Sequence, residues 1–271
     1  MIRNKFRQLL ASNRGRGRFG VQSKGAEATI YLYDFIVDSE DDARWMGGVS
    51  AESFAKEVAA LDVATIHLRV NSPGGSVFGG RVMENALRQH KARVIAHVDG
   101  LAASAASVVI MGADEIEMAD GAFLMIHKAW TIAIGNADDL LHEAGVLEQI
   151  DGTLAQTYAK RTGIDAAKIA DMLAAETWIE AGAAVEQGFA DRVAGDDKEA
   201  AAPAANAWDL SAFNHAPQPQ PQQQAAPQPP QQPLQAAPQP LQAAPQPAPL
   251  QPPQPDRAAL QRAVLARLIP A

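Results

Sequence analysis

The sequence predicts an α/β fold built on a mostly parallel sheet. Three stretches rich in β-branched and aromatic residues lie at 28–37, 64–70 and 93–98. They alternate with two helical patterns at 50–61 and 77–90. Alternating strands and helices are typical of right-handed crossovers between parallel strands. Sites in such sheets lie at the carboxyl ends of the strands. The two glycine-containing loops that follow the second and third strands are therefore candidate sites.

Turn and capping residues mark the ends of these elements. Ser50 suits the N-cap of the first helix, because a side-chain oxygen there accepts from a free N–H of the first turn. The turn 71–76 ends the second strand, and Asp99-Gly100 ends the third. The small-residue run 101–111 is expected to be a buried helix.

A long helix dominates the second half of the predicted domain. It is expected at 136–161, with Asn136 as its N-cap and Gly163 at its end. Its apolar residues spread over more than one face, whereas packing on one domain needs a single stripe. This surplus indicates contact with a second subunit. The remaining expected elements are strands at 114–118 and 123–127 and helices at 165–175 and 179–189.

Composition divides the chain into four parts. Residues 1–26 are expected to be a basic flexible arm, and 27–195 a single folded domain. Residues 196–255 are expected to be a disordered linker, because from about residue 203 they are almost entirely Pro, Gln and Ala, with too few apolar side chains to offset the entropy of ordering. Residues 256–271 are expected to form a short amphipathic helix.

Charge and residue usage exclude several classes of function. The net charge of −8 argues against a general nucleic-acid binder. The arm 1–26 could still touch nucleic acid or an acidic partner, or be a solvated tail. The absence of cysteine excludes disulfides, thiolate catalysis and Cys-ligated metals. We expect no metal, no cofactor, no membrane span and a cytoplasmic location.

One motif could present a nucleophilic serine. Such a serine needs a sharp turn from strand to helix and free backbone N–H groups that can hold an oxyanion. The run Gly100-Leu101-Ala102-Ala103-Ser104-Ala105 offers Ser104 in that setting. The alternative is a small-residue helix packed on the sheet, with Ser104 filling space.

Three other positions could complete a serine-hydrolase site. The turn containing Gly75 could expose a second oxyanion N–H, or be a plain Pro-Gly turn. His127 ends an apolar strand and could act as general base, or be a satisfied core histidine. Glu176, or Asp171 before it, could orient His127 as the acid of a triad.

Together these motifs resemble the Clp proteolytic-subunit family of serine peptidases over about residues 28–193. The resemblance rests on an Asn-Ser-Pro-Gly-Gly turn, a Gly-x-Ala-Ala-Ser motif, a Met-Ile-His motif, a Thr-Gly helix end and a closing Ala-Ala-Val-Glu-Gln-Gly-Phe-Ala-Asp segment. They lie at 71–75, 100–104, 125–127, 162–163 and 183–191.

The resemblance implies a fold, a site and an assembly. The fold would be ClpP/crotonase-like, with stacked ββα-type units, a parallel sheet and a long interface helix. Ser104 would be the nucleophile and His127 the base, and the N–H groups of Gly75 and Ala105 would form the oxyanion hole. Protein or peptide substrates, a homo-oligomeric ring and the absence of a cofactor are implied with them.

The third member of the triad departs from the family. The family places aspartate where this chain has Glu176, so Glu176 is expected as the acid and Asp171 is the alternative. The Glu-Thr-Trp run and the Pro/Gln-rich tail are similar to Clp-related head maturation proteases of tailed phages. That similarity implies scaffold and capsid partners, in a prohead within the host cytoplasm.

Other functions remain open from the sequence. A general cytoplasmic Clp subunit would need a separate ATPase, because the chain has no phosphate-binding Gly-x-x-x-x-Gly-Lys-Ser/Thr loop. An acyl-CoA enzyme of the crotonase-type fold would not need Ser104 and His127. A non-catalytic assembly scaffold would leave Ser104 dispensable.

Overall fold

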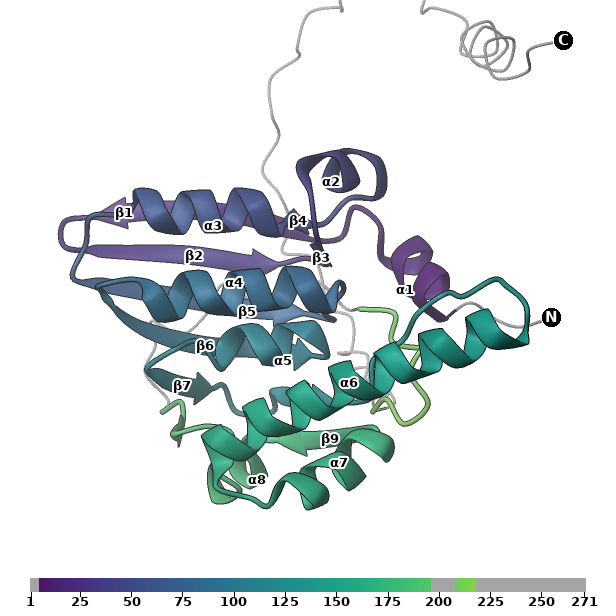
Figure 1. Cartoon of the computed structure of the whole chain (residues 1–271). Coiled ribbons are helices and arrows are strands. Elements are labelled where there is room, and N and C mark those ends of the chain that lie inside the picture. The colour runs from purple at the N-terminus through teal and green to yellow at the C-terminus, as the bar shows by residue number, and fades with distance from the viewer. Residues whose placement is uncertain (1–4, 196–207, 218–271) are drawn as a thin grey trace, which may run out of the picture. The chain divides into compact units, whose positions relative to one another are not determined.

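A computed structural model of the chain describes residues 5–195 and 208–217 (Figure 1). Its centre is an eight-stranded sheet. The strands of this sheet are β1 (Arg18–Lys24), β2 (Glu27–Tyr33), β5 (Thr65–Ser72), β6 (Arg93–Ala103), β7 (Glu115–Met118), β8 (Phe123–Ile126), β9 (Thr177–Glu180) and β10 (Arg192–Val193). A separate small sheet contains β3 (Ile36–Val37) and β4 (Val49–Ser50).

The main sheet is mostly parallel, so the predicted α/β fold is confirmed. Its main path runs β1-β2-β5-β6-β7-β10, with β8 paired to β6 and β9 paired to β8. The β1–β2 and β8–β9 pairs are antiparallel and the others are parallel. The helices are α1 (Lys5–Asn13), α2 (Glu40–Met46), α3 (Ala51–Ala60), α4 (Val77–Gln89), α5 (Ala105–Ile110), α6 (Ala137–Thr162), α7 (Ala166–Ala174) and α8 (Ala181–Glu186).

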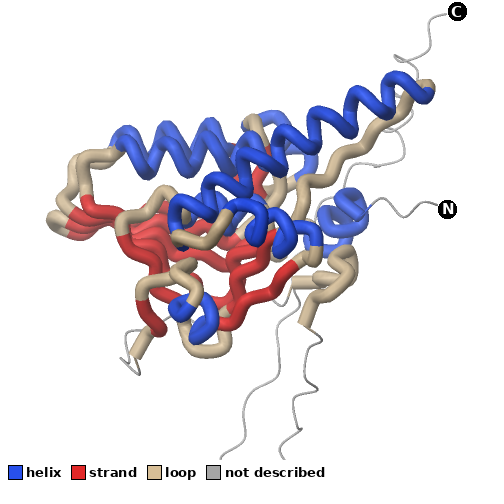
Figure 2. The backbone as a smooth tube through the Cα atoms, turned by 60° about the horizontal axis from the view of Figure 1, so that its bottom comes forward, coloured by secondary structure: helices blue, strands red, loops and turns tan. Residues whose placement is uncertain are grey.

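One face of the sheet packs against helices and forms the main core. Alternate residues of β5, namely Ile66, Leu68 and Val70, are completely buried, as the period of two in a strand requires. They share one apolar cluster with Phe54 of α3 and Met83 of α4. Figure 2 shows these helices layered on one side of the strands. Burial of this apolar face is the main source of the fold's stability.

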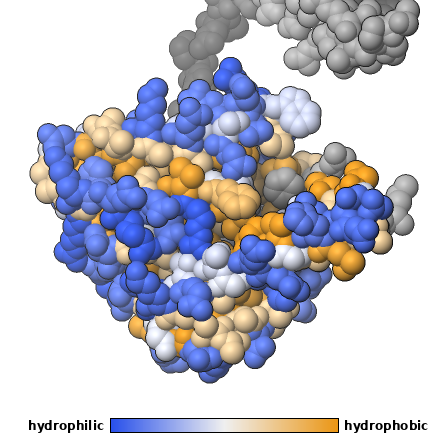
Figure 3. Space-filling model, viewed as in Figure 1, coloured by the Kyte–Doolittle hydropathy of each residue, from blue (hydrophilic) through white to orange (hydrophobic). Residues whose placement is uncertain are grey.

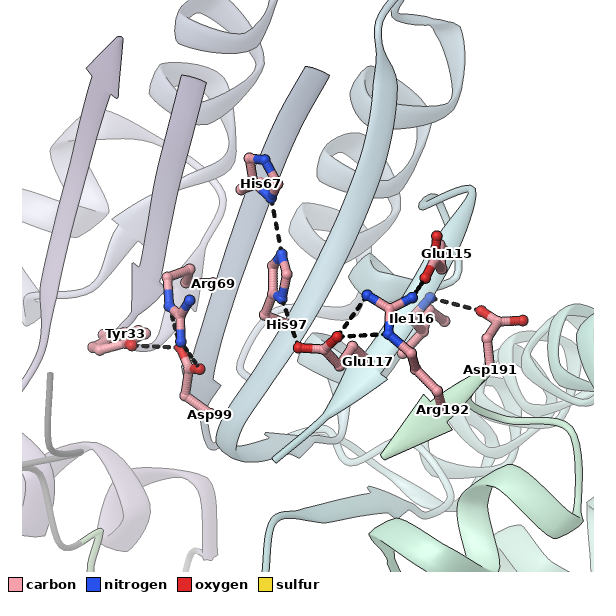
Figure 4. Close-up of polar contacts among 10 residues, drawn as sticks. All are labelled: Tyr33, His67, Arg69, His97, Asp99, Glu115, Ile116, Glu117, Asp191 and Arg192. Atoms are coloured by element: carbon pink, nitrogen blue, oxygen red, sulfur yellow. Dashed lines mark hydrogen bonds and ion pairs between the residues drawn. The ribbon is translucent and has the colours of Figure 1, made fainter. Parts of the chain in front are cut away.

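The opposite face of the sheet is polar and its groups bind one another (Figure 4). Asp99 accepts hydrogen bonds from Tyr33 Oη at 2.5 Å and from Arg69 Nε at 2.9 Å. The Nε2 atom of His97 lies 3.0 Å from Nδ1 of His67, and its Nδ1 atom lies 3.2 Å from Oε1 of Glu117. Burial, followed by the hydrogen bond to Asp99, raises the pKa of Tyr33 to about 12.

Helix α6 is the longest of the described helices. Its N-terminal half extends past the strands (Figure 1), and only Leu154, Ala155 and Tyr158 of its residues are buried. Asn136 caps its first turn, and Gly163 ends it with a φ of 74°. Both ends are therefore as predicted. None of the described helices combines the length and the apolar character needed to cross a bilayer.

Several expected elements differ from those observed. Residues 101–103 were expected in a helix but extend β6, because their backbone pairs with β8. Residues 179–180 belong to β9, and α8 is shorter than the expected helix 179–189. The Ser50 N-cap was predicted correctly and accepts from Ser53 N at 3.1 Å.

The flexibility predicted for the basic arm 1–26 is wrong for the residues that the structure describes. Residues 5–13 form α1, and 18–24 form β1, which pairs along its whole length with β2. Phe19 and Val21 pack against the main core, and the Arg18 guanidinium lies 4.9 Å from the centre of the Tyr31 ring. Pairing with β2 orders this basic segment.

The predicted Pro/Gln/Ala linker is also partly corrected. Residues 208–217 lie against the domain, where Trp208 and Phe213 contribute to a second apolar cluster. The rest of 196–255, and the helix expected at 256–271, lie outside the described residues.

Candidate active site

Ser104 lies at the turn between β6 and α5. Its φ is 53°, a value that costs energy in a residue with a Cβ. Its N–H donates to the carbonyl of Met125 at 2.9 Å, which ties the turn to β8. Helix α5 begins at the next residue, so the first N–H groups of that helix have no acceptor within it. The turn presents a hydroxyl beside unpaired helix N–H groups, the setting that a serine nucleophile requires.

His127 follows β8 and lies beside Ser104. Strands β6 and β8 are parallel with Ala103 opposite Met125, so the residues that follow this pair emerge together. The distance between His127 Nε2 and Ser104 Oγ is 2.7 Å. Such contact allows the imidazole to take the serine proton.

The surroundings of His127 keep its imidazole neutral. Burial lowers its pKa to about 4, although the charge of Glu176 opposes that shift. The rings of Trp130 and Phe213 pack edge-on against the imidazole, with centroid distances of 4.6 and 5.6 Å. A neutral imidazole at pH 7 can accept a proton without first losing one.

Glu176 comes next to His127 through the pairing of β8 with β9. Thr177 pairs with Ile126 in this antiparallel ladder, and Glu176 is the residue before it. Ser104 and Glu176 are the two non-glycine residues with positive φ in the described part of the chain. Backbone strain of this kind gathers at functional sites, because it persists only where surrounding contacts enforce it.

The carboxylate of Glu176 is held by a segment that follows the domain expected at 27–195. Its Oε2 accepts from the backbone N and the side-chain Nδ2 of Asn214, at 3.0 and 3.1 Å. Its Oε1 accepts from His215 N at 2.7 Å and Trp178 Nε1 at 3.4 Å. Burial would raise the pKa of Glu176, but these donors, chiefly Asn214 N and His215 N, lower it overall. No hydrogen bond joins Glu176 to His127 among the described residues, so they interact through charge.

Two glycines let the loop after β5 pack closely on its neighbours, Gly74 on the nucleophile turn and Gly75 on Ile36 of β3. A Cβ on Gly74 would lie 2.6 Å from the carbonyl oxygen of Ala103 and 2.8 Å from Ser104 Cβ. A Cβ on Gly75 would lie 2.1 Å from the carbonyl oxygen of Ile36. Only residues without side chains permit this approach. It brings Gly75 to the same cleft as Ser104 and Ala105.

A cleft of about 450 Å³ opens on Ser104 and His127. The start of α4, including Val77 and Phe78, forms one wall, and Leu147 on α6 lies on another. Figure 3 shows hydrophobic side chains gathered on the face where α6 passes this region. The cleft can therefore accept apolar side chains next to the serine hydroxyl.

The alternative acid Asp171 and a second serine near the nucleophile, Ser107, are not part of this arrangement. Asp171 is exposed on α7, and no described contact joins its carboxylate to His127. Ser107 is completely buried, and its hydroxyl bonds the carbonyl of Ser104 at 2.6 Å and Tyr158 Oη at 2.8 Å. Ser107 thus joins the nucleophile turn to α6. Within the described residues there is no cluster of three or more His, Asp or Glu suited to a metal.

Sequence reasoning missed residues outside the expected domain 27–195 that surround Glu176 and His127. Phe213, Asn214 and His215 fall in the expected linker, and Lys5 falls in the expected arm. A signal was present, because Trp208, Leu210 and Phe213 are large apolar residues within an otherwise Pro-, Gln- and Ala-rich region.

Comparison with known proteins places the chain in a family. The family model for Clp protease matches residues 49–197. ATP-dependent Clp protease proteolytic subunits are among its relatives. That of Pleurastrum terricola is 31% identical over 139 residues, or 50% of this chain and 70% of its own length. The subunit of Deinococcus radiodurans is 29% identical over 194 residues, which are 69% of this chain and 91% of its own length.

A solved structure supports the fold. A ClpP1 mutant from Listeria monocytogenes superposes with a TM-score of 0.54 at 18% identity. The match covers 70% of this chain and 96% of the other. Residues 208–217, which contact Glu176, lie beyond the region of the family match.

Proposed function

The chain belongs to the Clp protease family, and we propose that it is a serine endopeptidase with Ser104 as nucleophile and His127 as general base. The observation that supports this most directly is the 2.7 Å contact between Ser104 Oγ and His127 Nε2 at the edge of the cleft. The strained turn at Ser104 supports it independently.

The geometry suits acyl transfer in two steps. Ser104 Oγ attacks the peptide carbonyl carbon as its proton passes to His127 Nε2, and the N–H groups of Gly75 and Ala105 bind the resulting oxyanion. The protonated His127 then gives its proton to the leaving amine. Water, activated by the same imidazole, releases the acyl group from Ser104.

In this scheme Glu176 acts through its charge. It lies near His127 and has a lowered pKa, so it is ionised at neutral pH. A carboxylate beside an imidazole stabilises the imidazolium that forms during each step. Its donors from Asn214 and His215 hold that carboxylate in place.

The decisive experiment identifies the nucleophile. A fluorophosphonate probe should label the full chain, and Ser104→Ala should abolish both labelling and peptide hydrolysis, the latter by at least about a thousandfold. Ser107→Ala is the matched control and should keep the label. Labelling of the Ser104→Ala variant would show that Ser104 is not the nucleophile. A wild-type chain that neither labels nor hydrolyses peptides would favour a non-catalytic scaffold.

We propose further that the natural substrates are scaffold and capsid proteins of a tailed-phage prohead. The Glu-Thr-Trp run beside the site and the Pro/Gln-rich tail favour this role. A general Clp subunit that receives unfolded chains from an ATPase is the competing proposal. It is favoured by the relatives, which are proteolytic subunits of ATP-dependent proteases.

A cleavage assay separates these two roles. The full chain is incubated with the product of a neighbouring capsid gene, with and without an unfolding ATPase and ATP. Limited cleavage at discrete sites without the ATPase is expected for a head maturation protease. Degradation that requires the ATPase would replace that role with the general one.

A further inference from the structure

Residues 208–216, called the strap here, pack against the back of the proposed catalytic site. Phe213 and Ala212 are buried in the second apolar cluster, together with Leu101 of β6 and Met125 of β8. Those two strands position Ser104 and His127. The strap therefore touches the same elements that build the site.

The strap supplies most of the donors to Glu176. Of the four hydrogen bonds that this carboxylate accepts, three come from Asn214 N, Asn214 Nδ2 and His215 N. Two of these donors are backbone groups, so a change of side chain does not remove them. Hydrogen bonds to a charged acceptor are the stronger kind, and they fix the orientation of the carboxylate.

The strap also closes the apolar surroundings of His127. The Phe213 ring contacts His127, Trp130 and Trp178, at centroid distances of 5.6, 5.2 and 5.7 Å. The charged or polar groups that face the imidazole are Ser104, Glu176 and Lys5 of α1, and the Lys5 charge also lowers the pKa of His127. Lys5 Nζ lies 2.5 Å from Asn214 Oδ1, so the strap holds this cation too.

The N-terminal end of the strap is attached away from the site. Asn13, completely buried at the end of α1, donates to the carbonyl of Asp209 at 2.8 Å and accepts from its N–H at 2.6 Å. Trp208 Nε1 lies 3.3 Å from Asn71 Oδ1, and its ring packs on Phe35. These contacts make the strap part of the folded domain.

The strap does not cover the substrate cleft. That cleft is lined by residues of the loop after β5 and of α4, α5 and α6 and by the segment from His127 to Ile132, and no strap residue lies among its described lining. A lid would reach over Ser104. The strap instead lies behind His127 and Glu176.

We propose that the strap is a positioning element of the active site, in which Asn214 and His215 orient Glu176 and Phe213 closes the apolar side of His127. This inference rests on the proposed peptidase function. It assigns part of the catalytic apparatus to a segment outside the residues 49–197 of the family match.

Proline substitution tests the backbone donors. His215→Pro removes the N–H that binds Glu176 Oε1, whereas His215→Ala keeps that N–H and loses only the ring. We expect His215→Pro to lower kcat at least about tenfold more than His215→Ala does, with KM of a small peptide nearly unchanged. Equal kcat values for the two variants, or a higher kcat in His215→Pro, would overturn the proposal. Circular dichroism and thermal unfolding establish that both variants fold.

A double-mutant cycle tests whether the effect passes through Glu176. In a Glu176→Ala background, the same proline substitution should have little further effect on kcat, because the group it orients is gone. An undiminished loss in that background would mean that the proline damages the site by another route, and would contradict the proposal.

A titration tests Phe213 without requiring activity. In the full chain, NMR should show the pKa of His127 rising from about 4 toward its ordinary value when Phe213→Ala admits water to the imidazole. In an active enzyme the acidic limb of the pH profile of kcat/KM should move to higher pH by the same amount. An unmoved His127 pKa would refute the role of Phe213. Absence of hydrolysis in the wild type would instead refute the peptidase function and leave this titration valid.

Discussion

Ser104 and Glu176 share a positive φ, and each is held in it by a neighbouring strand. The Ser104 turn is tied to the carbonyl of Met125, while Glu176 is followed directly by the β9 pairing with β8. The two strained residues therefore flank one strand, β8, which His127 directly follows. At the residue scale, backbone contacts with β8 place both Ser104 and Glu176 beside the His127 imidazole.

The identity of the acid leads to a residue-scale prediction. Glu176→Ala should lower kcat by at least about a hundredfold, because His127 loses the nearest negative charge. Asp171→Ala is the control and should leave kcat within about twofold, since Asp171 is exposed on α7. Steady-state kinetics on a small peptide measure both. The reverse order of effects would assign the role to Asp171.

The buried His127 predicts a dependence of stability on pH. Its pKa is about 4 when folded and about 6.5 when unfolded, so between these values the unfolded chain binds more protons. The stability that this group contributes is present above pH 6.5 and is lost as pH falls toward 4. From pH 7 to pH 5 the loss is about 2 kcal/mol.

A variant without the titrating group isolates this effect. Urea unfolding should show that His127→Gln loses less stability than the wild type between pH 7 and pH 5. An identical pH dependence in the two proteins would show that His127 titrates normally in the folded state.

At the scale of elements, α6 has more apolar surface than its own domain covers. Leu140 and Leu141 near its start are 46% and 71% exposed, and Ile132 and Ile134 in the preceding loop are 49% and 96% exposed. Apolar side chains gathered in this way indicate a contact surface. The surplus predicted from the sequence is therefore present in the structure.

Self-association through α6 is the prediction that follows. Replacing Leu140 and Leu141 together by Asp should shift the protein toward monomers, since charges at such a surface oppose apolar contact. Light scattering coupled to size-exclusion chromatography measures the mass. Gln149→Asp adds one charge to an exposed position of the same helix and should leave the mass unchanged. A wild-type chain that is monomeric at micromolar concentration would refute the prediction.

At the scale of the described domain, segments from opposite ends of the chain meet. Helix α1 and the strap lie about two hundred residues apart in sequence, yet Asn13 bonds both backbone groups of Asp209. Gln8 Nε2 donates to Ser211 Oγ at 2.9 Å near this junction. The first helix thus holds the segment that contacts Glu176.

Breaking this junction should loosen the strap selectively. Asn13→Ala removes two hydrogen bonds to Asp209, each contributing about 1 kcal/mol. Hydrogen exchange should accelerate in residues 208–216 and stay unchanged in the strands of the core. Gln22→Ala, an exposed residue of β1, is the control. Unchanged exchange in the strap would show that Asn13 does not hold it.

The sequence by itself determined the parts that depend on local pattern. Alternating strand and helix periods predicted the parallel sheet, and cap residues such as Ser50, Asn136 and Gly163 predicted where helices begin or end. Motif order predicted that Ser104 and His127 would lie together, because parallel strands bring their carboxyl ends to one edge. The structure places these two side chains in contact.

Only the tertiary structure decided the surroundings of that pair. Residues 101–103 and 179–180 were expected in helices, and their strand conformation comes from pairing with β8. The strap has little propensity of its own, and it is ordered by burying Phe213 and part of Trp208 and by donating N–H groups to Glu176. Such order arises from contacts between distant segments, whose gain exceeds the entropy cost only after the domain has folded.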